Sequence, residues 1–454
     1  MTQSFWTLDR VSAALADHAA APLPRGTTEI AAITTDTRSI GAGQLFVALK
    51  GERFDGHDYL GAAVAAGAAG VVVSRAPLLG VLGVPVFQVD DTLVALGALA
   101  RHWRRAWGHT VVAVAGSNGK TTTKDLIRAA LGEEMRVHAT SGNLNNRVGV
   151  PLTILAIPPE AEIAIVELGT SIPGEVSILR DIAEPDISVV TSVAEEHLEG
   201  LGDLAGVLRE EAACYEGVEV GVAPASQPEI ADAGRPLAKR IIAAGLDEGD
   251  VRPAGWKLDS DGRGTLDLGT VTVSPPLRGA HNLQNTMLAI AVARVVGVTD
   301  ESIATGIARM PAPKMRVAWE TVGRATLIND AYNANPGSTR AAIGLLHGLG
   351  TGRQRVAVLG TMRELGAASD TCHDDISRLA LESGVDIVAG IGEFAASLRR
   401  VAPGDDRVLT AATVEEIWPP LSRRLAPDAV ILLKASRGVQ LERLVPHLTT
   451  WATQ

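Results

Sequence analysis

Residues 111–125 read VVAVAGSNGKTTTKD, in which a run of small and β-branched residues passes through Gly116 and Gly119 into a polar segment. The apolar run predicts a buried strand, and the turn at the two glycines predicts a helix that begins near Lys120. Such a loop directs backbone N–H groups and a helix N-terminus at one place, where Lys120 adds a positive charge and Thr121 offers a hydroxyl to Mg²⁺. The segment therefore predicts a phosphate-binding loop, with an ordinary glycine-rich turn as the alternative interpretation.

The loop departs from the common G-x-x-x-x-G-K-[ST] pattern at one position, because the first glycine would fall at Val114. What remains is a shortened G-x-x-G-K-T form. This departure favours a relative of the P-loop enzymes over a standard kinase or GTPase.

The composition is that of a globular protein, with 46% hydrophobic and only 3% aromatic residues among 454 positions. At roughly 150 residues per domain, this length predicts about three domains. Few aromatic side chains and a net charge of −11 argue against a nucleic-acid partner, which needs stacking platforms or a basic face. Cys214 and Cys372 lie far apart and form no metal-type pair, which favours a reducing, cytoplasmic setting.

No targeting or membrane segment is expected. Residues 1–10 lack a basic stretch followed by an apolar core, and the apolar run at 61–73 is shorter than the roughly eighteen residues that a span requires. We expect a monomer without a membrane span.

The first domain is expected at residues 1–108. Periodicity predicts helices at 7–20, 59–69 and 91–107 and strands at 29–33, 44–48 and 70–73. Two polar clusters follow strands, Asp36-Thr37-Arg38 and residues 50–57. They are interpreted either as turns with solvated charges or as an anion or nucleotide pocket that uses Arg38 and Lys50.

The central domain is expected at residues 109–314, where strands and helices alternate in the βαβ manner of a mostly parallel sheet. The predicted strands are 111–115, 163–168, 187–192, 218–222 and 240–244. The loop at 141–151 contains Asn143, Asn145 and Asn146, whose amides suit an ordered binding loop, although a plain connection is the alternative.

An acid and a histidine follow strands of this sheet. Glu167 ends the second strand, where a carboxylate is placed to hold Mg²⁺ or is there by chance. His197 comes just after the third strand and is a candidate ligand or base. Its neighbours Glu195 and Glu196 are predicted to be solvated charges.

Two segments near the end of the central domain have distinctive chemistry. Residues 278–285 open an Ala-rich helix, with Asn282 as the expected cap and a possible base-recognising amide. Residues 310–316 contain two prolines before a basic pair, which predicts an interdomain linker whose Arg316 guanidinium reaches a phosphate.

The third domain is expected at residues 315–454 as a Rossmann-like α/β unit. Its predicted strands are 325–329, 355–359, 387–389 and 429–434. The loops at 330–336, 360–366 and 434–438 all follow strands, so they should gather at the ligand-binding edge of a parallel sheet. No second phosphate loop is present in the sequence, which favours a lid or substrate domain.

Five segments, taken in order, resemble the Mur ligase family of ATP-dependent amide-bond ligases of cell-wall synthesis. They are AGSNGKTT at 115–122, VELG at 166–169, HLE at 197–199, HN at 281–282 and DAYNANP at 330–336. The resemblance spans essentially the whole chain. Within the family, segments 36–38, 43–57, 142–146 and 364–366 look most like the branch that joins D-alanyl-D-alanine to UDP-N-acetylmuramoyl-tripeptide.

The resemblance implies ATP and Mg²⁺ as cofactors and a reaction through an acyl phosphate of the tripeptide. It assigns the phosphates to Gly116, Ser117, Asn118, Gly119, Lys120, Thr121 and Thr122, adenine to Asn282 and Asn285, ribose to Asp330, and the phosphates after domain closure to Arg316. One Mg²⁺ would be held by Thr121 and Glu167 and a second by His197. The UDP-sugar-peptide would meet Arg38, Lys50, Asn143, Asn145 and Asn146, and Asn333 would contact substrate from the third domain.

One position departs from the family. Where the family usually has a lysine that is carbamylated by CO₂ and ligates the second Mg²⁺, this sequence has Glu211. We expect the Glu211 carboxylate to take that role directly, beside the catalytic residues Lys120 and His197. A solvated helix acid, with the role lost or moved to Glu210, is the alternative.

Two rival interpretations remain at this point. A folylpolyglutamate synthetase-like amide ligase resembles the central and C-terminal domains but lacks the N-terminal domain that carries segments 36–38 and 43–57. A non-catalytic ATP-binding switch or transport subunit predicts no ligase motifs in a third domain, whereas 330–336 and 434–438 are present.

Overall fold

The computed structural model describes residues 5–75, 82–311, 315–349 and 352–453. Contact clustering divides the chain into two compact units. Unit 1 comprises residues 1–113, 136–169 and 175–186, and unit 2 comprises residues 114–135, 170–174 and 187–454. The expected domain boundaries at 108 and 314 stay predictions, and the linker residues 312–314 lie outside the described residues.

Unit 1 contains a four-stranded parallel sheet in the order β3-β4-β5-β6. Its strands are β3 (Ile33–Thr34), β4 (Leu45–Val47), β5 (Gly70–Val73) and β6 (Val86–Gln88), and its helices are α1 (Leu8–Ala14) and α2 (Leu60–Ala65). A short antiparallel pair joins β1 (Trp6–Thr7) to β2 (Glu29–Ile30). The helix predicted at 7–20 is shorter than expected, because α1 ends at Ala14 and a 3₁₀ turn follows at Ala16–His18.

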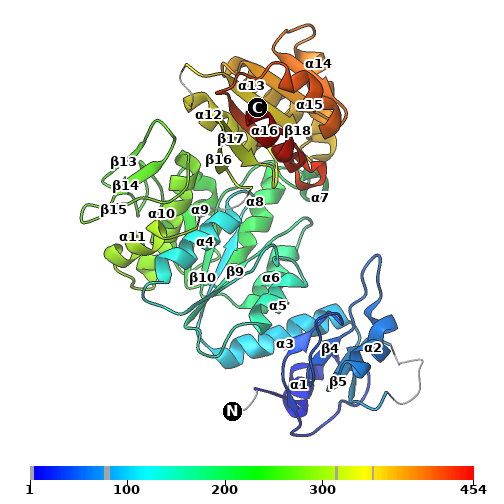
Figure 1. Cartoon of the computed structure of the whole chain (residues 1–454). Coiled ribbons are helices and arrows are strands. Elements are labelled where there is room, and N and C mark those ends of the chain that lie inside the picture. Colours follow the sequence, from blue (N-terminus) through cyan, green and yellow to red (C-terminus); the bar gives the residue numbers. More distant parts are fainter. Residues whose placement is uncertain (1–4, 76–81, 312–314, 350–351, 454) are drawn as a thin grey trace. The chain divides into compact units, whose positions relative to one another are not determined.

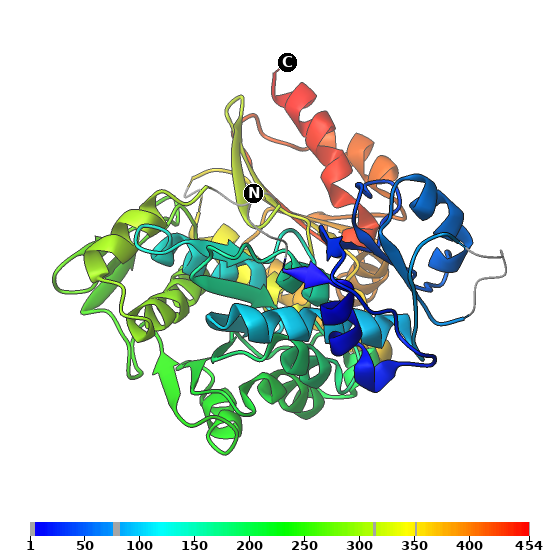
Figure 2. The ribbon, with the colours of Figure 1, turned by 90° about the horizontal axis from the view of Figure 1, so that it is seen from below.

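The long helix α3 (Thr92–Trp107) ends as predicted, and it is the light blue helix of Figures 1 and 2. The Asp91 side chain accepts hydrogen bonds from the N–H groups of Leu93 and Val94, and Gly108 closes the helix with φ of 74°. Unit 1 also holds β8 (Val137–Ala139), α5 (Gly149–Leu155), β9 (Ile163–Glu167) and α6 (Glu175–Ala183), with β8 and β9 parallel.

Strand β7 (Thr110–Ala115) is the buried strand predicted from the apolar run, and α4 (Lys120–Leu131) begins at the predicted lysine. In unit 2, β10 (Ile187–Val190), β11 (Val220–Pro224) and β12 (Ile241–Ala244) are parallel neighbours. Strand β10 ends at Val190, before the predicted end at 192. The next two residues, Thr191 and Ser192, donate hydrogen bonds from their hydroxyls to the Asn118 carbonyl of the glycine-rich loop.

Further helices of unit 2 cover these strands or flank them. They are α7 (Leu198–Leu201), α8 (Leu204–Ala212), α9 (Pro228–Gly234), α10 (Ala280–Val295) and α11 (Asp300–Ala308). Helices α10 and α4 pack side by side (Figure 1). A small antiparallel sheet of β13 (Gly255–Leu258), β14 (Gly264–Asp267) and β15 (Thr272–Val273) was not predicted, because its strands are two to four residues long and β13 is exposed throughout.

The predicted cap of α10 is wrong. The helix begins at Ala280 with Gly279 as its N-cap, so Asn282 lies inside the first turn. The Asn282 side chain donates back to the Arg278 carbonyl at 2.8 Å. The Asn282 amide therefore stabilises the segment before the helix, at Arg278, and does not cap the helix.

The C-terminal part of unit 2 is a six-stranded sheet in the order β16-β17-β21-β18-β19-β20, in which only the β16–β17 pair is antiparallel. The strands are β16 (Ala318–Val322), β17 (Ala325–Asp330), β18 (Arg355–Gly360), β19 (Ile387–Ile391), β20 (Val408–Ala411) and β21 (Val430–Lys434). The helices are α12 (Pro336–Gly348), α13 (Ser369–Glu382), α14 (Glu393–Val401), α15 (Val414–Ser422) and α16 (Leu444–Ala452).

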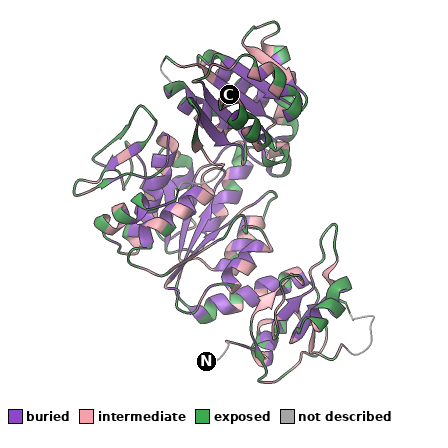
Figure 3. Ribbon diagram, viewed as in Figure 1, coloured by how far each residue is buried: buried purple, intermediate pink, exposed green. Residues whose placement is uncertain are grey.

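Both faces of this sheet are covered, and its inner strands are buried (Figure 3). Side chains such as Ile328 and Leu432 face one helical layer, while Leu327 and Leu433 face the other. Burial on both faces is what a Rossmann-like parallel sheet requires. The predicted α/β fold class with parallel sheets is therefore confirmed.

Candidate functional site

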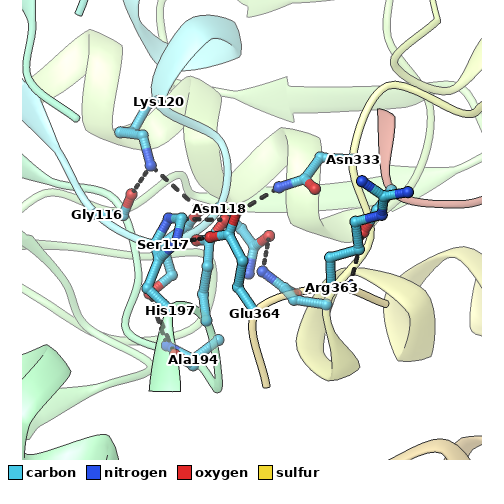
Figure 4. A network of polar contacts seen from close by, with 12 residues as sticks. Gly116, Ser117, Asn118, Lys120, Ala194, His197, Asn333, Arg363 and Glu364 are labelled. Carbon is cyan, nitrogen blue, oxygen red and sulfur yellow. Dashed lines mark hydrogen bonds and ion pairs between the residues drawn. The ribbon is translucent and has the colours of Figure 1, made fainter. Parts of the chain in front are cut away.

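The glycine-rich loop between β7 and α4 is held in place by the segment that follows β10 (Figure 4). The Ser192 hydroxyl accepts from the Asn118 N–H at 3.0 Å, and the Thr191 hydroxyl donates to the Asn118 carbonyl at 2.6 Å. The Ser117 hydroxyl accepts from the Ala194 N–H at 3.0 Å. These bonds fix the loop's backbone before any ligand arrives, which a phosphate cradle needs.

Two glycines allow the loop to turn. Gly116 has φ of 118° and Gly119 has φ of 85°, conformations that side-chain-bearing residues rarely adopt. A Cβ on Gly116 would lie 2.4 Å from the Thr191 hydroxyl oxygen, and one on Gly119 would lie 2.8 Å from the side-chain oxygen of Asn285. Asn285, predicted as an adenine contact, therefore lies directly against the loop.

Lys120 opens α4 and turns its ammonium group back toward the loop, where it donates to the Gly116 carbonyl at 2.5 Å. Thr121 is half-buried and Thr122 is buried in the first turn of the helix. The predicted cluster of Gly116, Ser117, Asn118, Gly119, Lys120, Thr121 and Thr122 is thus one continuous loop and helix start.

Glu211 lies on α8, yet its carboxylate reaches the loop. Its side chain is buried, and Oε2 accepts from the Gly116 N–H at 2.6 Å. Burial raises the pKa of Glu211 to about 7, although the nearby Lys120 charge and the Gly116 hydrogen bond oppose that rise. The interpretation of Glu211 as a solvated helix acid is therefore wrong.

Glu210, the alternative acid, faces elsewhere. Its two oxygens accept hydrogen bonds from the Thr170 hydroxyl at 3.1 Å and from the Gly174 N–H at 2.7 Å. Those bonds give Glu210 a role in holding the 170–174 loop, and they leave Glu211 as the helix acid that contacts the phosphate loop.

His197 is the N-cap of α7, with an unusual φ of 55°, and its Nδ1 points at the Glu364 carboxylate. Burial alone would lower the pKa of His197, but the hydrogen bond to Glu364 and the charges of Glu196 and Glu364 outweigh it and raise the pKa. A carboxylate on Nδ1 fixes the tautomer and leaves Nε2 for a ligand. Glu364 belongs to the segment 364–366.

Glu196 contradicts the prediction of a solvated charge. It is only 7% exposed, and Oε1 accepts from the Asn333 side-chain amide at 3.0 Å. Its other oxygen, Oε2, is buried without a hydrogen-bond partner. The His197 Nε2 atom lies 3.7 Å from Oε1, too far for a hydrogen bond.

The loop at 330–336 joins this neighbourhood from the C-terminal sheet. Asn335 donates to the Asn118 side-chain oxygen at 2.9 Å, so the phosphate loop contacts it directly. The buried Lys434 ammonium binds both the Asp330 carboxylate and the Asn333 carbonyl at 2.7 Å. Lys434 begins the loop predicted at 434–438, but its role in ordering Asp330 and Asn333 was not predicted.

Asp330 and Arg316 also have partners in this structure. The Asp330 carboxylate accepts from the Val317 N–H at 3.1 Å, and the Arg316 guanidinium stacks 4.1 Å above the Tyr332 ring. Asn282 and Asn285 are both buried in the first turns of α10. The Asn285 side-chain amide donates to the Asn282 side-chain oxygen at 3.4 Å. The structure thus gathers the phosphate loop, Asn285, His197, Glu211 and the 330–336 loop within unit 2.

The remaining predicted residues belong to unit 1. Glu167 is buried at the end of β9, and its Oε1 accepts from the Asn145 side-chain amide at 2.9 Å. Asn146 accepts from the N–H groups of Val148 and Gly149 at the start of α5, and Asn143 is exposed. Asn145 and Glu167, assigned to different ligands, thus contact each other.

The N-terminal basic residues are exposed. Arg38 pairs with Asp36 at 2.7 Å, and this hydrogen-bonded pair lowers the pKa of Asp36 to about 2. Lys50 is exposed, and the turn after it is closed by Asp55, whose carboxylate holds the buried His57 ring at 2.6 Å. The pocket proposed for Arg38 and Lys50 stays a prediction.

The glycine-rich phosphate loop, the strand-following histidine and the Rossmann-like third sheet define a class, and family models place the chain in it. The description "Mur ligase family, catalytic domain" matches residues 29–104, "Mur ligase middle domain" matches 114–293, and "Mur ligase, glutamate ligase domain" matches 315–437. The chain therefore belongs to the Mur ligase family, as the sequence motifs predicted.

Individual relatives narrow the comparison within the family. The UDP-N-acetylmuramoyl-tripeptide–D-alanyl-D-alanine ligase of Bacillus subtilis (strain 168) is 35% identical over 93% of each chain. The enzyme of the same name from Escherichia coli (strain K12) is 35% identical over 92% of this chain and 93% of its own.

Solved structures agree with these relatives. A crystal structure of MurF from Acinetobacter baumannii aligns with a TM-score of 0.88 and 29% identity over 98% of this chain and 99% of its own. The MurF ligase from Thermotoga maritima, solved in complex with ADP, aligns with a TM-score of 0.83 and 26% identity over 94% and 98%. A Mycobacterium tuberculosis folylpolyglutamate synthase shares the fold alone, at 19% identity and a TM-score of 0.64 over 78% of this chain.

Among the described residues no helix is long and apolar enough to cross a membrane.

Proposed function

We propose that the chain is an ATP-dependent ligase that joins D-alanyl-D-alanine to UDP-N-acetylmuramoyl-tripeptide in peptidoglycan precursor synthesis. One observation carries the proposal: the phosphate loop contacts the third-domain loop 330–336 through the Asn335–Asn118 hydrogen bond. A ligase needs both loops at one site. The phosphate loop binds the phosphoryl donor, and the loop 330–336 brings substrate bound to the third domain close to that donor. The relatives at 35% identity over more than nine-tenths of the chain support the choice of substrates.

The chemistry follows from charge. The tripeptide carboxylate attacks the γ-phosphoryl group of ATP, ADP leaves, and the carboxylate becomes an acyl phosphate. After the dipeptide ammonium has lost a proton, the neutral amine attacks the acyl carbon. The bond between that carbon and the phosphate oxygen breaks, and phosphate leaves together with the second proton of the amine. Negative charge develops on the transferred group, so the N–H groups of residues 116–122 and the Lys120 ammonium stabilise the transition state most where that charge grows. In this assignment Asn282 and Asn285 hold adenine, Asp330 holds ribose and Arg316 neutralises phosphate.

Mg²⁺ fits the residues present. The Glu211 carboxylate is buried against the phosphate loop, and burial raises its pKa to about 7. The positive charge near this carboxylate is therefore too small to stabilise its ionised form fully. A hard divalent cation would provide that charge. Thr121 and Glu167 would hold one Mg²⁺ and His197 with Glu211 a second, and the metal would supply charge neutralisation for the transferred phosphoryl group.

The role of Glu211 has a test that uses the family's own lysine. We expect the wild-type activity to be insensitive to added bicarbonate, and Glu211→Lys to regain activity only when bicarbonate is supplied. Metal binding by the ADP complex, followed by Mn²⁺ electron paramagnetic resonance, should weaken in Glu211→Gln. The exposed Glu229→Gln on α9 is the control. A wild-type enzyme that needs bicarbonate would count against the direct carboxylate.

The UDP-sugar-peptide is assigned to residues of unit 1. Arg38, Lys50, Asn143, Asn145 and Asn146 offer exposed or half-buried cationic and amide groups that suit a UDP-linked sugar. Asn333 offers an exposed amide to the substrate from the third domain. We also propose that the enzyme works as a monomer in the cytoplasm.

The experiment is phosphate release from ATP with UDP-N-acetylmuramoyl-tripeptide, with and without D-alanyl-D-alanine, and with a folate plus glutamate as the competing pair. We expect release that requires both cell-wall substrates and a product of the joined mass. Release with neither substrate, or with folate and glutamate in their place, would overturn the proposal.

A further inference from the structure

The Glu196 carboxylate is the most unusual polar group outside the assigned machinery. Its side chain is 8% exposed, and it lies on the segment between β10 and α7, next to His197. Oε1 has the Asn333 amide as its partner, whereas Oε2 is buried and has none in the part of the chain that the structure describes. A buried carboxylate oxygen without a donor is costly, so this geometry calls for one that arrives with a ligand.

Asn333 extends the same site toward the surface. It is exposed, its amide nitrogen serves Glu196, and its backbone carbonyl is fixed by Lys434 at 2.7 Å. Lys434 is itself fixed by Asp330. Asn333 is therefore held through its side-chain nitrogen and its backbone carbonyl, and its side-chain oxygen Oδ1 is the second acceptor beside the Glu196 carboxylate.

The acceptor pair suits an ammonium group better than a metal. Mg²⁺ demands near-octahedral oxygen coordination, whereas a primary ammonium has three donors and is satisfied by a carboxylate and a neighbouring carbonyl.

We propose that Glu196 and Asn333 form the recognition site for the amino group of the incoming dipeptide. This inference rests on the proposed function, in which the second substrate brings an amine to the acyl phosphate. Glu196 comes from the central sheet beside His197, and Asn333 comes from the third domain, so the amine is held where the two meet the phosphate loop. Glu196 thereby sets the specificity for an amine over a hydroxyl nucleophile.

The test compares Glu196→Gln with Glu195→Gln, a half-buried neighbour that undergoes the same change of charge. We expect Glu196→Gln to raise KM for D-alanyl-D-alanine by about tenfold or more, because truncating one partner of a buried charge pair is costly. KM for ATP, KM for the UDP-tripeptide and the Mg²⁺ requirement should stay within about twofold of wild type. Glu195→Gln should leave all of them unchanged.

A substrate analogue makes the readout specific. In 2-hydroxypropanoyl-D-alanine a hydroxyl replaces the amino group, and as a competitive inhibitor it should bind the wild type about tenfold or more weakly than the dipeptide binds. In Glu196→Gln that preference should disappear. An unchanged preference, or a rise in the ATP KM or the Mg²⁺ requirement instead, would overturn the inference and assign Glu196 to the nucleotide or metal.

Two further arms keep the test decisive. If Glu196→Gln does not fold, Glu196→Asp keeps the charge, and it should give a smaller loss in the dipeptide KM alone. A wild type that binds amine and hydroxyl analogues equally overturns the inference without any variant. A wild type whose phosphate release ignores D-alanyl-D-alanine refutes the proposed function, whereas an active wild type with an unaffected Glu196→Gln refutes only this inference.

Discussion

At the scale of single residues, the Glu211 carboxylate links the site to the stability of the protein. Its pKa is raised from 4.5 to about 7, mainly by burial, so the folded state holds a proton between these values that the unfolded state has released. The folded state therefore loses stability as pH rises through this window. Over the full window the loss is about 3 kcal/mol.

This predicts a measurable difference between two proteins. In urea unfolding with EDTA from pH 5 to pH 8, the wild type should lose about 3 kcal/mol more than Glu211→Gln. Glu229→Gln, which removes an exposed acid, should follow the wild type. Parallel curves for wild type and Glu211→Gln would show that the Glu211 pKa is not raised in the folded protein.

The sequence predicted some residues of the site and missed others for a physical reason. Lys120 and Gly116 were predictable, because the loop that needs them is local in sequence. Glu196 was assigned to solvent, since an acid beside another acid usually is solvated, and only the distant Asn333 and the fold around it bury the side chain. Burial of a carboxylate depends on tertiary contacts that no short motif encodes.

At the scale of elements, the turn from β7 into α4 needs glycine. Gly116→Ala would place a Cβ 2.4 Å from the Thr191 hydroxyl and 2.7 Å from its backbone nitrogen, at φ of 118°. We expect a loss of roughly 3 kcal/mol or more in unfolding free energy, together with loss of ATP binding. Calorimetry and nucleotide titration measure the two effects.

A second glycine provides the matched control. Gly344 lies inside α12, and a Cβ there would meet no atom within 4 Å. Gly344→Ala should raise stability by about 0.5–1 kcal/mol and leave ATP binding unchanged. If both alanine variants were equally stable, the turn would not require the glycine at 116.

Asn335 combines two functions at the start of α12. Its side chain accepts from the Ser338 N–H at 2.9 Å as a helix cap, and it donates to Asn118 of the phosphate loop. Asn335→Ala should cost about 1 kcal/mol of stability and also raise KM for ATP. Thr413→Ala removes the cap of α15 and should cost a similar amount with no effect on KM. Equal KM values in both variants would contradict the coupling.

Element prediction was reliable for buried strands and weak for short or exposed ones. The apolar runs of β5, β7 and β18 were located to within one residue, because burial on both faces leaves a continuous hydrophobic signal. Strand β13 carries no such signal, and β16 is only partly covered. The end of β10 was misplaced because Thr191 continues the apolar run in a residue type that favours strands, whereas its hydroxyl and that of Ser192 donate to Asn118 of the phosphate loop.

At the scale of the whole molecule, three family models cover the chain in order, and the family fold was predictable from motifs spread along it. The arrangement of sheets follows from strand order, since loops after parallel strands gather at one edge. In the C-terminal sheet this brings Lys434 from β21 to Asp330 from β17, residues a hundred positions apart. Such pairings are set by topology and could not be predicted from either loop alone.

The central claim is that this molecule activates a carboxylate as an acyl phosphate at the Gly116–Thr122 loop before an amine takes it. The most direct test follows oxygen from a tripeptide carboxylate labelled with ¹⁸O, in the presence of ATP, Mg²⁺ and D-alanyl-D-alanine. We predict that each phosphate released carries one ¹⁸O atom from the carboxylate, in step with the joined product. Phosphate that carries oxygen from water, with the label retained on the tripeptide, would contradict the account.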